Sequence, residues 1–372
     1  MFEQAMPKRI ANFEIVRELG RGGMGCVYLA KQMKHTADGG EEILREIALK
    51  VLPMQTPGNS KEQNEYNEAK DRFDAEVRAV SLLESGNIVR LYDSGFADGM
   101  QYLAMQYIDG SSLFDIIQRY KKTMPIDKII NYTKQICRGL LFAHNKGVIH
   151  RDIKPQNILV SRENDNCHIS DFGIARIKRD ERLTMVGMAV GTPEYMSPEQ
   201  ASGKNLDQQT DLYSLGILIY ELCTGNPPFW GSDPVSVAYR QVHEEPKKPS
   251  KIRHDIPVRL ENIIMKAIKK NKSERYKTAY DILKDLDTIE REEKSSVSDD
   301  IRATPKFGLD RLTYQERRRT TRFTEQRANV SKQERIQDKS KFMPIIIILS
   351  VLLGFAFAVI VMLILQNNNI AF

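Results

Sequence analysis

The sequence predicts an α+β protein with a β-rich amino-terminal part, a helical carboxy-terminal part and one long apolar segment near its end. Short strand-like runs separated by Gly, Asp or Pro fill residues 13–108. Helical runs dominate after Gly110, up to residue 291. Residues 345–365 carry no charge. Runs of strands followed by runs of helices are typical of the α+β class.

The strand-like runs are rich in β-branched and aromatic residues, which favour strands. They are "FEIVREL", "CVYLAKQ", "EIALKVL", "IVRLYDSGF" and "QYLAMQYI". One helix interrupts them, because Phe73, Val77, Val80 and Leu83 form an apolar stripe with spacings of four, three and three residues. We therefore expect a small sheet with one helix packed on it, and a boundary near residues 106–110.

The second part contains five helical runs and one hairpin. The helical runs are "SLFDIIQRY", "IDKIINYTKQICRGLLFAHNKG", "DQQTDLYSLGILIYELCTG", "DPVSVAYRQVHEE" and "RLENIIMKAIKK". The hairpin, "VIHRDIKPQNILVSRENDNCHISDFG", places Asp152, Lys154, Asn157 and Asp171 in polar breaks between apolar runs. Taken alone, this pattern fits either solvated hairpin ends or a site where charges converge.

Composition excludes several classes of protein. The chain has 372 residues and a net charge of +6, and most of the excess lies in residues 292–344, which hold 13 Lys/Arg against 9 Asp/Glu. In the rest of the chain, acidic and basic residues are nearly equal in number. This balance does not fit a nucleic-acid surface, so no nucleic-acid partner is expected. The four cysteines are scattered without a CxxC pair, which favours reduced thiols over disulfides or a zinc site. The amino terminus lacks the apolar run of a secretory signal.

A glycine-rich stretch, "ELGRGGMGCVYLAK", places Gly20, Gly22 and Gly25 in a GxGxxG pattern. A strand follows it, whereas a dinucleotide-binding fingerprint requires a helix there. Such a hairpin lets main-chain N–H groups approach phosphates, although a plain flexible turn has the same letters. Lys50 should share a strand face with Ala48 and pair with Glu76 beside the apolar stripe. The alternative is a solvated lysine and a surface glutamate.

These motifs occur in the order found in one family. The glycine loop, Lys50, Glu76, "HRDIKPQN", "DFG" and "GTPEYMSPEQ" together resemble a eukaryotic-like (Hanks-type) serine/threonine protein kinase over roughly residues 10–291, and "GGMGCVYLA" resembles the bacterial branch. The resemblance implies a bilobal protein kinase fold. Its kinase domain would span residues 1–291, with an N-lobe over about 10–107 and a C-lobe over about 108–291.

The resemblance also implies roles for individual residues. Asp152 would accept the proton of the substrate hydroxyl, with Lys154 offsetting charge on the transferring phosphoryl group, and Asn157 and Asp171 would hold Mg²⁺ or Mn²⁺. The residues implied to bind ATP are Gly20, Gly22, Gly25, Val27, Ala48, Lys50, Glu76, Met105, Tyr107, Ile108 and Leu159.

Further implications concern substrate and structural support. "DIKPQN" implies transfer to Ser/Thr hydroxyls of proteins, and Thr184 is the expected regulatory phosphorylation site. Four residues are expected to support the fold. Glu199 and Arg275 would form a buried ion pair, Asp211 would brace the catalytic loop, and His150 would pack in the core.

The carboxy-terminal end predicts a membrane anchor. Residues 345–365 would form a helix about 31 Å long, which matches a bilayer core of roughly 30 Å. Residues 302–341 hold 12 Lys/Arg against 5 Asp/Glu, so the positive-inside rule keeps the kinase domain cytoplasmic at the cell membrane. Residues 292–344 are expected to be a disordered basic linker, and residues 366–372 a short non-cytoplasmic tail without a sensor domain.

Small residues at Ser350, Gly354 and Ala358 recur every four positions, a spacing that allows two helices to pair as a homodimer. Small residues are also common in membrane helices that do not pair.

Three functions are compatible with the whole sequence to different degrees. The first is an active, ATP- and Mg-dependent membrane-tethered kinase that autophosphorylates its activation loop. The second is a pseudokinase scaffold that binds nucleotide and signals by contact. A kinase for small molecules is disfavoured by "GTPEYMSPEQ", which forms a peptide-substrate platform in the family that this chain resembles.

Overall fold

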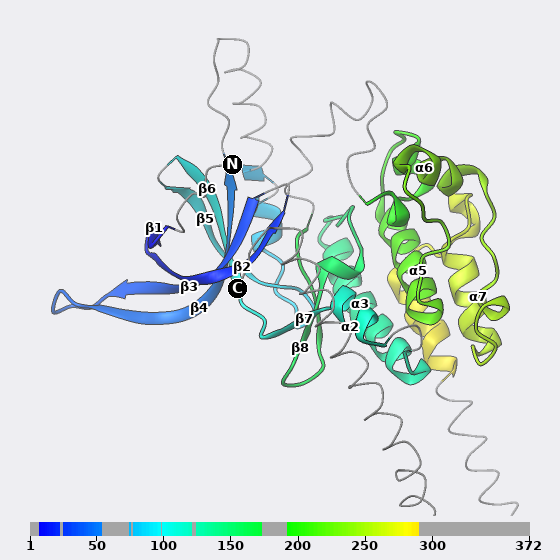
Figure 1. Cartoon of the computed structure of the whole chain (residues 1–372), viewed down its shortest axis with the longest axis horizontal. Helices are drawn as coiled ribbons and strands as arrows, with labels where there is room; N and C mark the ends of the chain where they lie inside the picture. Colours follow the sequence, from blue (N-terminus) through cyan, green and yellow to red (C-terminus); the bar gives the residue numbers. More distant parts are fainter. Residues whose placement is uncertain are drawn as a thin grey trace, which may run out of the picture. The chain divides into compact units, whose positions relative to one another are not determined.

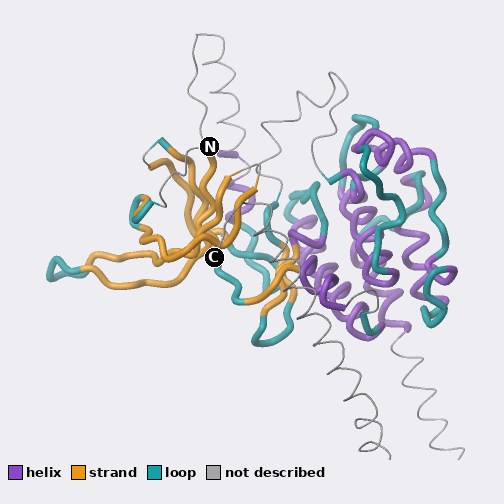
Figure 2. The backbone as a smooth tube through the Cα atoms, viewed as in Figure 1, coloured by secondary structure: helices purple, strands orange, loops and turns teal. Residues whose placement is uncertain are grey.

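The computed structural model describes residues 7–22, 25–53, 74–75, 77–97, 99–120, 124–172 and 192–289. Strands gather in the amino-terminal part of this region and helices in the carboxy-terminal part (Figure 2). The strands are β1 (Arg9–Ile10), β2 (Phe13–Gly22), β3 (Gly25–His35), β4 (Glu41–Pro53), β5 (Leu91–Ala97), β6 (Met100–Gln106), β7 (Gly110–Ser112), β8 (Ile158–Ser161) and β9 (Cys167–Ile169). The helices are α2 (Leu113–Tyr120), α3 (Ile126–Asn145), α4 (Pro198–Ala201), α5 (Gln208–Thr224), α6 (Pro234–His243) and α7 (Val258–Ala267).

The amino-terminal sheet is antiparallel, with strand order β1-β2-β3-β4-β6-β5 (Figure 1). Alternation along β4 sorts its side chains between the two faces. Ile47, Leu49 and Val51 are buried in one apolar cluster, whereas Ala48 and Lys50 on the opposite face are half-buried. The expected shared face of Ala48 and Lys50 is therefore confirmed.

The hairpin of β3 and β4 is longer than the sequence predicted and extends away from the rest of the sheet (Figure 1). Its outer half, up to His35 and from Glu41, lacks the alternation of apolar and polar residues that indicates a strand. Side-chain contacts stabilise this half. Arg9 pairs with Glu41 at 2.6 Å, and the guanidinium of Arg45 lies 4.4 Å from the ring centre of Tyr92.

The carboxy-terminal part is built around α5, whose residues 210–224 are all buried. A helix that is apolar on every side needs neighbours on every side, and α3 and α7 both pack on it. Gly216 allows α7 to approach closely, because a Cβ at this position would lie 2.7 Å from the Cβ of Ala267. All five predicted helical runs are confirmed, and residues 279–289 form a further helical stretch that was not predicted.

A second sheet, β7-β8-β9, carries the described part of the polar hairpin, residues 148–172. Main-chain hydrogen bonds join it to the segment before β5. Val89 N–H donates to the Ile169 carbonyl, and Ile169 N–H donates to the Asn87 carbonyl, both at 2.9 Å. The predicted helix before this segment is confirmed over residues 77–81, where Val77 and Val80 are buried.

Among the residues that the structure describes, no helix is long and apolar enough to span a membrane. The predicted linker (292–344), anchor (345–365) and tail (366–372) all lie outside those residues.

Candidate active site

The main chain of the loop before β8 is held by hydrogen bonds to the carboxylate of Asp211, which lies in the first turn of α5. This side chain is 1% exposed. It accepts hydrogen bonds from His150 N–H at 2.8 Å, from Arg151 N–H at 2.7 Å and from His144 Nε2 at 2.8 Å. A buried carboxylate requires such donors, since an unpaired charge in the interior is costly. The expected bracing role of Asp211 is thus confirmed.

His150 packs as a satisfied core histidine, as the sequence suggested. Its side chain is fully buried, and its ring centre lies 4.6 Å from that of Phe172. Nε2–H donates to the Ser170 carbonyl at 2.8 Å, and Nδ1 accepts from Asp152 N–H at 3.2 Å. Because both nitrogens are used in structural bonds, His150 is unsuited to act as a base.

Asp152, Lys154 and Asn157 form one connected cluster. The Lys154 ammonium lies 2.8 Å from Asp152 Oδ2. The Asn157 amide group donates to the Asp152 carbonyl at 2.8 Å and to Asp152 Oδ2 at 3.1 Å. These bonds fix the direction of the Asn157 side chain and leave its oxygen as an acceptor. The Asp152 side chain remains 22% exposed, so another molecule can reach it.

Lys50 and Asp171 come from distant parts of the chain and form an ion pair with a direct hydrogen bond. Burial opposes ionisation of Asp171, but the charge and hydrogen bond of Lys50 outweigh it, with help from Lys154, so the pKa of Asp171 lies below its ordinary value. The carboxylate is 36% exposed, whereas Lys50 is 13% exposed. The ionised carboxylate of Asp171 is therefore accessible as an oxygen ligand, and it lies beside the ammonium group of Lys50.

Two residues of this region have backbone conformations that side chains other than glycine rarely adopt. Arg151 has a φ of 65° and Asp171 a φ of 56°. Each such conformation costs on the order of 1–3 kcal/mol and persists only where the surroundings enforce it. At Arg151, the bond from its N–H to Asp211 supplies part of that enforcement.

The glycine-rich hairpin joins β2 to β3. Gly25 is required by the fold, because its φ is 132° and a Cβ would lie 2.0 Å from the Val51 carbonyl oxygen. A Cβ at Gly20 or Gly22 would meet nothing within 4 Å. Packing within the described protein therefore does not explain the glycines at these two positions.

The predicted adenine-contacting residues lie on four strands and one connection. Val27, Ala48 and Leu159 are half-buried on β3, β4 and β8. The β4–β6 register places Met105 opposite Ala48. Tyr107 and Ile108 follow β6, and their main-chain groups have no hydrogen-bond partner among the described residues.

Two predicted site residues lie outside the described residues, namely Glu76 and Thr184. The expected Lys50–Glu76 pair and the phosphorylation site therefore stay predictions.

The segment after residue 191 is tied to the loop before β8 by Gln200, a residue that the sequence did not indicate. Its side chain donates to the Arg151 carbonyl at 2.8 Å and also closes a capping box with Ser197 at the start of α4. The S-x-x-Q pattern of that capping box was visible in "SPEQ". The tie to Arg151 was not, because it joins residues 49 positions apart.

Glu199, which belongs to this segment, forms the expected buried ion pair with Arg275. Both terminal nitrogens of Arg275 lie 2.9 Å from carboxylate oxygens of Glu199. Burial opposes ionisation of Glu199, but Arg275 outweighs it and holds the pKa of Glu199 below its ordinary value.

Glu221, on α5, was also missed and supports the same segment. The Tyr195 hydroxyl donates to Glu221 Oε2 at 2.5 Å, and both residues are buried. Burial raises the pKa of Glu221 from 4.5 to about 7, while the bond from Tyr195 partly offsets that rise.

Replacing Glu221 with Gln should change how stability depends on pH. The folded protein binds a proton at Glu221 more tightly than the unfolded chain does. This group therefore makes stability fall as pH rises from about 4.5 to about 7. Urea unfolding between pH 5 and pH 8 should show a fall smaller by on the order of 2–3 kcal/mol in Glu221→Gln. The control Glu274→Gln, at an exposed carboxylate, should keep the wild-type slope. Equal slopes for all three proteins would contradict the assignment.

The sequence matches the protein kinase domain family over residues 13–286. Serine/threonine-protein kinase PknB of Mycobacterium leprae is 38% identical over 279 residues, covering 74% of this chain and 42% of the relative. PknB of Mycolicibacterium smegmatis is 37% identical over 280 residues, with the same coverage of 74% and 42%. The chain thus spans about two fifths of the length of the curated relatives it matches.

The fold agrees with this match. The kinase domain of Mycobacterium tuberculosis PknI superposes with a TM-score of 0.59 at 24% identity, covering 76% of this chain and 99% of that domain. The β-rich and helical parts are therefore the two lobes of a bilobal kinase fold. On its sequence match over residues 13–286, the chain belongs to the protein kinase family.

Proposed function

We propose that the chain is a serine/threonine protein kinase that transfers the γ-phosphoryl group of ATP to hydroxyl groups of proteins. One observation carries the proposal: Asp152, Lys154 and Asn157 form a hydrogen-bonded cluster, and Lys50 and Asp171 form an adjoining ion pair, although they come from separate segments. Phosphoryl transfer needs alignment and charge neutralisation more than covalent help from the protein. This cluster supplies a carboxylate acceptor, two cations and two oxygen ligands.

In the proposed reaction, the substrate hydroxyl donates its proton to Asp152 as its oxygen attacks the γ-phosphorus. The bond from the γ-phosphorus to the bridging oxygen breaks, and ADP leaves. Lys154, 2.8 Å from Asp152, is close enough to stabilise negative charge on the transferring group. Gln200 and Tyr195 keep the substrate-side segment attached to the same loop and to α5.

The nucleotide would lie between the glycine-rich hairpin and β8. No side chain at Gly20 or Gly22 obstructs the approach of phosphate oxygens to the main chain, and the space beside each glycine is open. Val27, Ala48 and Leu159 offer half-buried apolar surface to the base, next to Met105. The main-chain groups of Tyr107 and Ile108, which have no hydrogen-bond partner in the described part of the chain, suit the hydrogen-bonding edge of adenine.

Asp171 and Asn157 fit a magnesium ion through the chemistry of their donors. Mg²⁺ prefers a few carboxylate or carbonyl oxygens and completes its shell with water and phosphate oxygens. Asp171 offers an ionised oxygen, and Asn157 uses its amide hydrogens on Asp152 and so keeps its oxygen. Within the described residues no three His, Cys, Asp or Glu side chains could hold a metal by themselves. When bound, the ion would offset charge on the phosphates.

The alternative function, a pseudokinase scaffold, would not need these groups to be kept. Lys50, Asp152, Asn157 and Asp171 are all present and connected as transfer would need. We therefore favour the active enzyme.

Replacing Lys50 with Met should lower γ-phosphoryl transfer by about 100-fold or more, because one preorganised cation is lost at the phosphates. Transfer from radiolabelled ATP to a generic protein substrate measures this, and circular dichroism verifies that the variant is folded. Lys34→Met, at an exposed position of β3, is the matched control and should keep wild-type activity. Near-normal transfer by Lys50→Met would refute the role of Lys50.

We also propose that Thr184 is phosphorylated by a second copy of the chain. Of the hydroxyl residues between Gly173 and Glu199, Thr184 is the only one that precedes residue 192 in the sequence. Arg151 precedes Asp152, and a phosphate paired with such an arginine can order an activation loop. Membrane confinement and pairing through Ser350, Gly354 and Ala358 would raise the effective concentration of one copy for another.

Replacing Gly354 and Ala358 with Leu should therefore slow phosphorylation of Thr184 in vesicles. The activity of enzyme already phosphorylated should not change. Mass spectrometry of Thr184 over time, at several ratios of protein to lipid, measures the rate. A rate that does not depend on this ratio would indicate reaction within one chain. Unchanged kinetics in the leucine variant would refute helix pairing through these small residues.

The proposed anchor at residues 345–365 would hold the kinase domain at the cytoplasmic face of the cell membrane, with the basic linker as its tether. Deleting residues 343–372 should release the protein from membranes and leave catalysis on a soluble substrate unchanged. Sedimentation after a high-salt wash is the measurement. A truncated protein that still sediments with membranes would show that the anchor lies elsewhere.

A further inference from the structure

Three consecutive main-chain carbonyls, those of residues 193–195, are bound by buried side chains of the helical lobe. The carboxamide of Gln241, in the last turn of α6, donates to the Pro193 carbonyl at 3.2 Å and to the Glu194 carbonyl at 2.6 Å. The Ser214 hydroxyl, on α5, donates to the third carbonyl at 2.7 Å. These bonds fix the main chain of a stretch that has only one turn of 3-10 helix of its own.

The carboxamide of Gln241 has a single possible orientation. The side chain is fully buried, and its oxygen accepts from the Tyr213 hydroxyl, on α5, at 2.7 Å. A flipped amide would place the oxygen against the carbonyls of Pro193 and Glu194, which can only accept hydrogen bonds. Both donors and the acceptor of Gln241 therefore connect α5, α6 and this stretch of main chain.

Lys270 holds the end of α6 in place. Its ammonium group donates to the main-chain carbonyls of Gln241 at 2.8 Å and Arg240 at 3.3 Å. It also lies 3.3 Å from the Tyr213 hydroxyl and 4.3 Å from the ring centre of Phe229. A cation stabilises the carbonyls of the last turn of a helix and the face of an aromatic ring. Consequently, α6 presents the Gln241 amide from a fixed position.

The main chain that Gln241 binds lies on the substrate side of the proposed reaction. Residues 193–195 belong to "GTPEYMSPEQ", the peptide-substrate platform of the family, and Gln200 of the same platform donates to the Arg151 carbonyl, next to Asp152. Within the described part of the chain, Gln241 makes no hydrogen bond to the charged cluster that would act on the phosphates. Its bonds thus concern the platform and not the nucleotide.

We propose that Gln241 is a positioning residue for the protein substrate, acting through the main chain of residues 193–194. A platform already held in its binding conformation spares the substrate the cost of ordering it. Without the two Gln241 donors, only a fraction of the molecules would have this conformation, and the apparent affinity for the substrate would fall by that fraction. Saturating substrate would restore the conformation, so the maximal rate is kept. This inference rests on the proposed kinase function.

Replacing Gln241 with Met in the full-length chain tests this role, because methionine has a similar length and no donors. In steady-state transfer to casein, the KM for casein should rise at least about fivefold. The KM for ATP and kcat should both stay within about twofold of the wild type. A loss of stability alone would instead lower kcat, by reducing the folded fraction, and leave the KM for casein unchanged.

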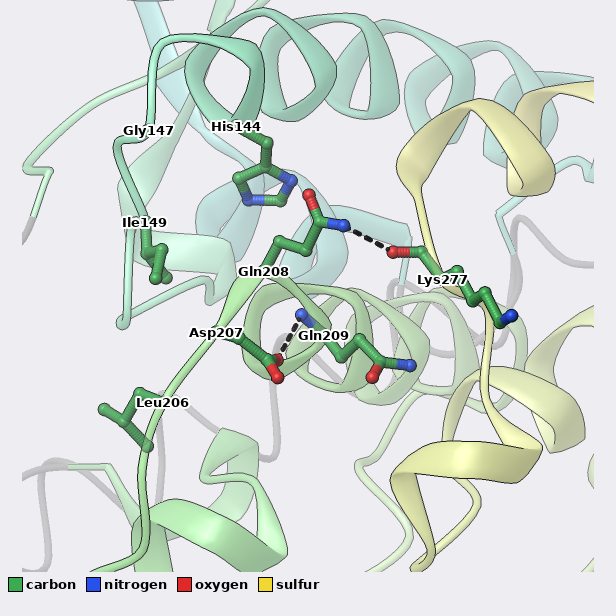
Figure 3. A pocket seen from close by; sticks show the side chains of 8 residues that line it. All are labelled: His144, Gly147, Ile149, Leu206, Asp207, Gln208, Gln209 and Lys277. Carbon is green, nitrogen blue, oxygen red and sulfur yellow. Dashed lines mark hydrogen bonds between the residues drawn. The ribbon is translucent and has the colours of Figure 1, made fainter.

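Gln209→Met is the matched control. The Gln209 amide, at the start of α5 beside a cavity of about 390 Å³ (Figure 3), also donates to two main-chain carbonyls, those of Lys272 at 2.9 Å and Tyr276 at 2.8 Å. Both acceptors lie in the connection after α7 and not in the platform. This variant loses the same kind of bonds and should keep the wild-type KM for casein.

Hydrogen exchange gives a second readout that needs no activity. Exchange at the amides of residues 194–197, followed by mass spectrometry, should be at least about fivefold faster in Gln241→Met and unchanged in Gln209→Met. Tyr213→Phe removes only the hydroxyl that orients the Gln241 amide and keeps the buried ring. It should raise the exchange rate and the KM for casein by about two- to threefold, and it decides the matter where Gln241→Met does not fold.

Unchanged exchange or an unchanged KM for casein in Gln241→Met would overturn the role of Gln241. An equal rise of this KM in Gln209→Met, or wild-type values of both quantities in Tyr213→Phe, would overturn it as well. No transfer by the wild type would instead refute the proposed kinase function. The exchange rates would then still decide whether Gln241 holds this part of the chain.

Discussion

The buried carboxylate of Asp211 is the constraint on which the rest of the site depends. It accepts three hydrogen bonds, two of them from the main chain of the loop that carries Asp152. Hydrogen bonds to a charged group contribute about 1.5–3 kcal/mol each, enough to enforce the strained backbone at Arg151. Because α5 is buried on every side, this carboxylate has a fixed position from which to hold the loop.

Charges of the site are arranged around that fixed loop. Lys154 and Asn157 bind Asp152 from the same loop, so their geometry is local. Lys50 must instead be brought from the other lobe, and it pairs with Asp171 across 121 residues of sequence. Gln200 and Tyr195 then attach the substrate-side segment to the loop and to α5. Several independent segments are thus held to one support.

Much of this was predictable from the sequence. The alternation of apolar and polar residues predicted the strands, and the helical spacing of apolar residues predicted the helices. Both patterns indicate which face of each element is buried. The order of "HRDIKPQN" and "DFG" indicated the polar cluster, since both motifs are local. The outer hairpin of β3 and β4 was missed because its sequence lacks alternation. Gln200, Glu221 and His144 were missed because their roles arise from contacts between residues 26 to 67 positions apart.

The central claim is that Asp152 accepts a proton while a hydroxyl takes the γ-phosphoryl group. Single-turnover transfer from ATP to a serine- or threonine-containing peptide, by the full-length chain and by Asp152→Asn, tests it most directly. Asparagine keeps the shape of the side chain but cannot accept the proton as a base. The account predicts rapid transfer by the wild type and a loss of about 100-fold or more in the variant. Equal rates for the two proteins, or no transfer by the wild type, would contradict it.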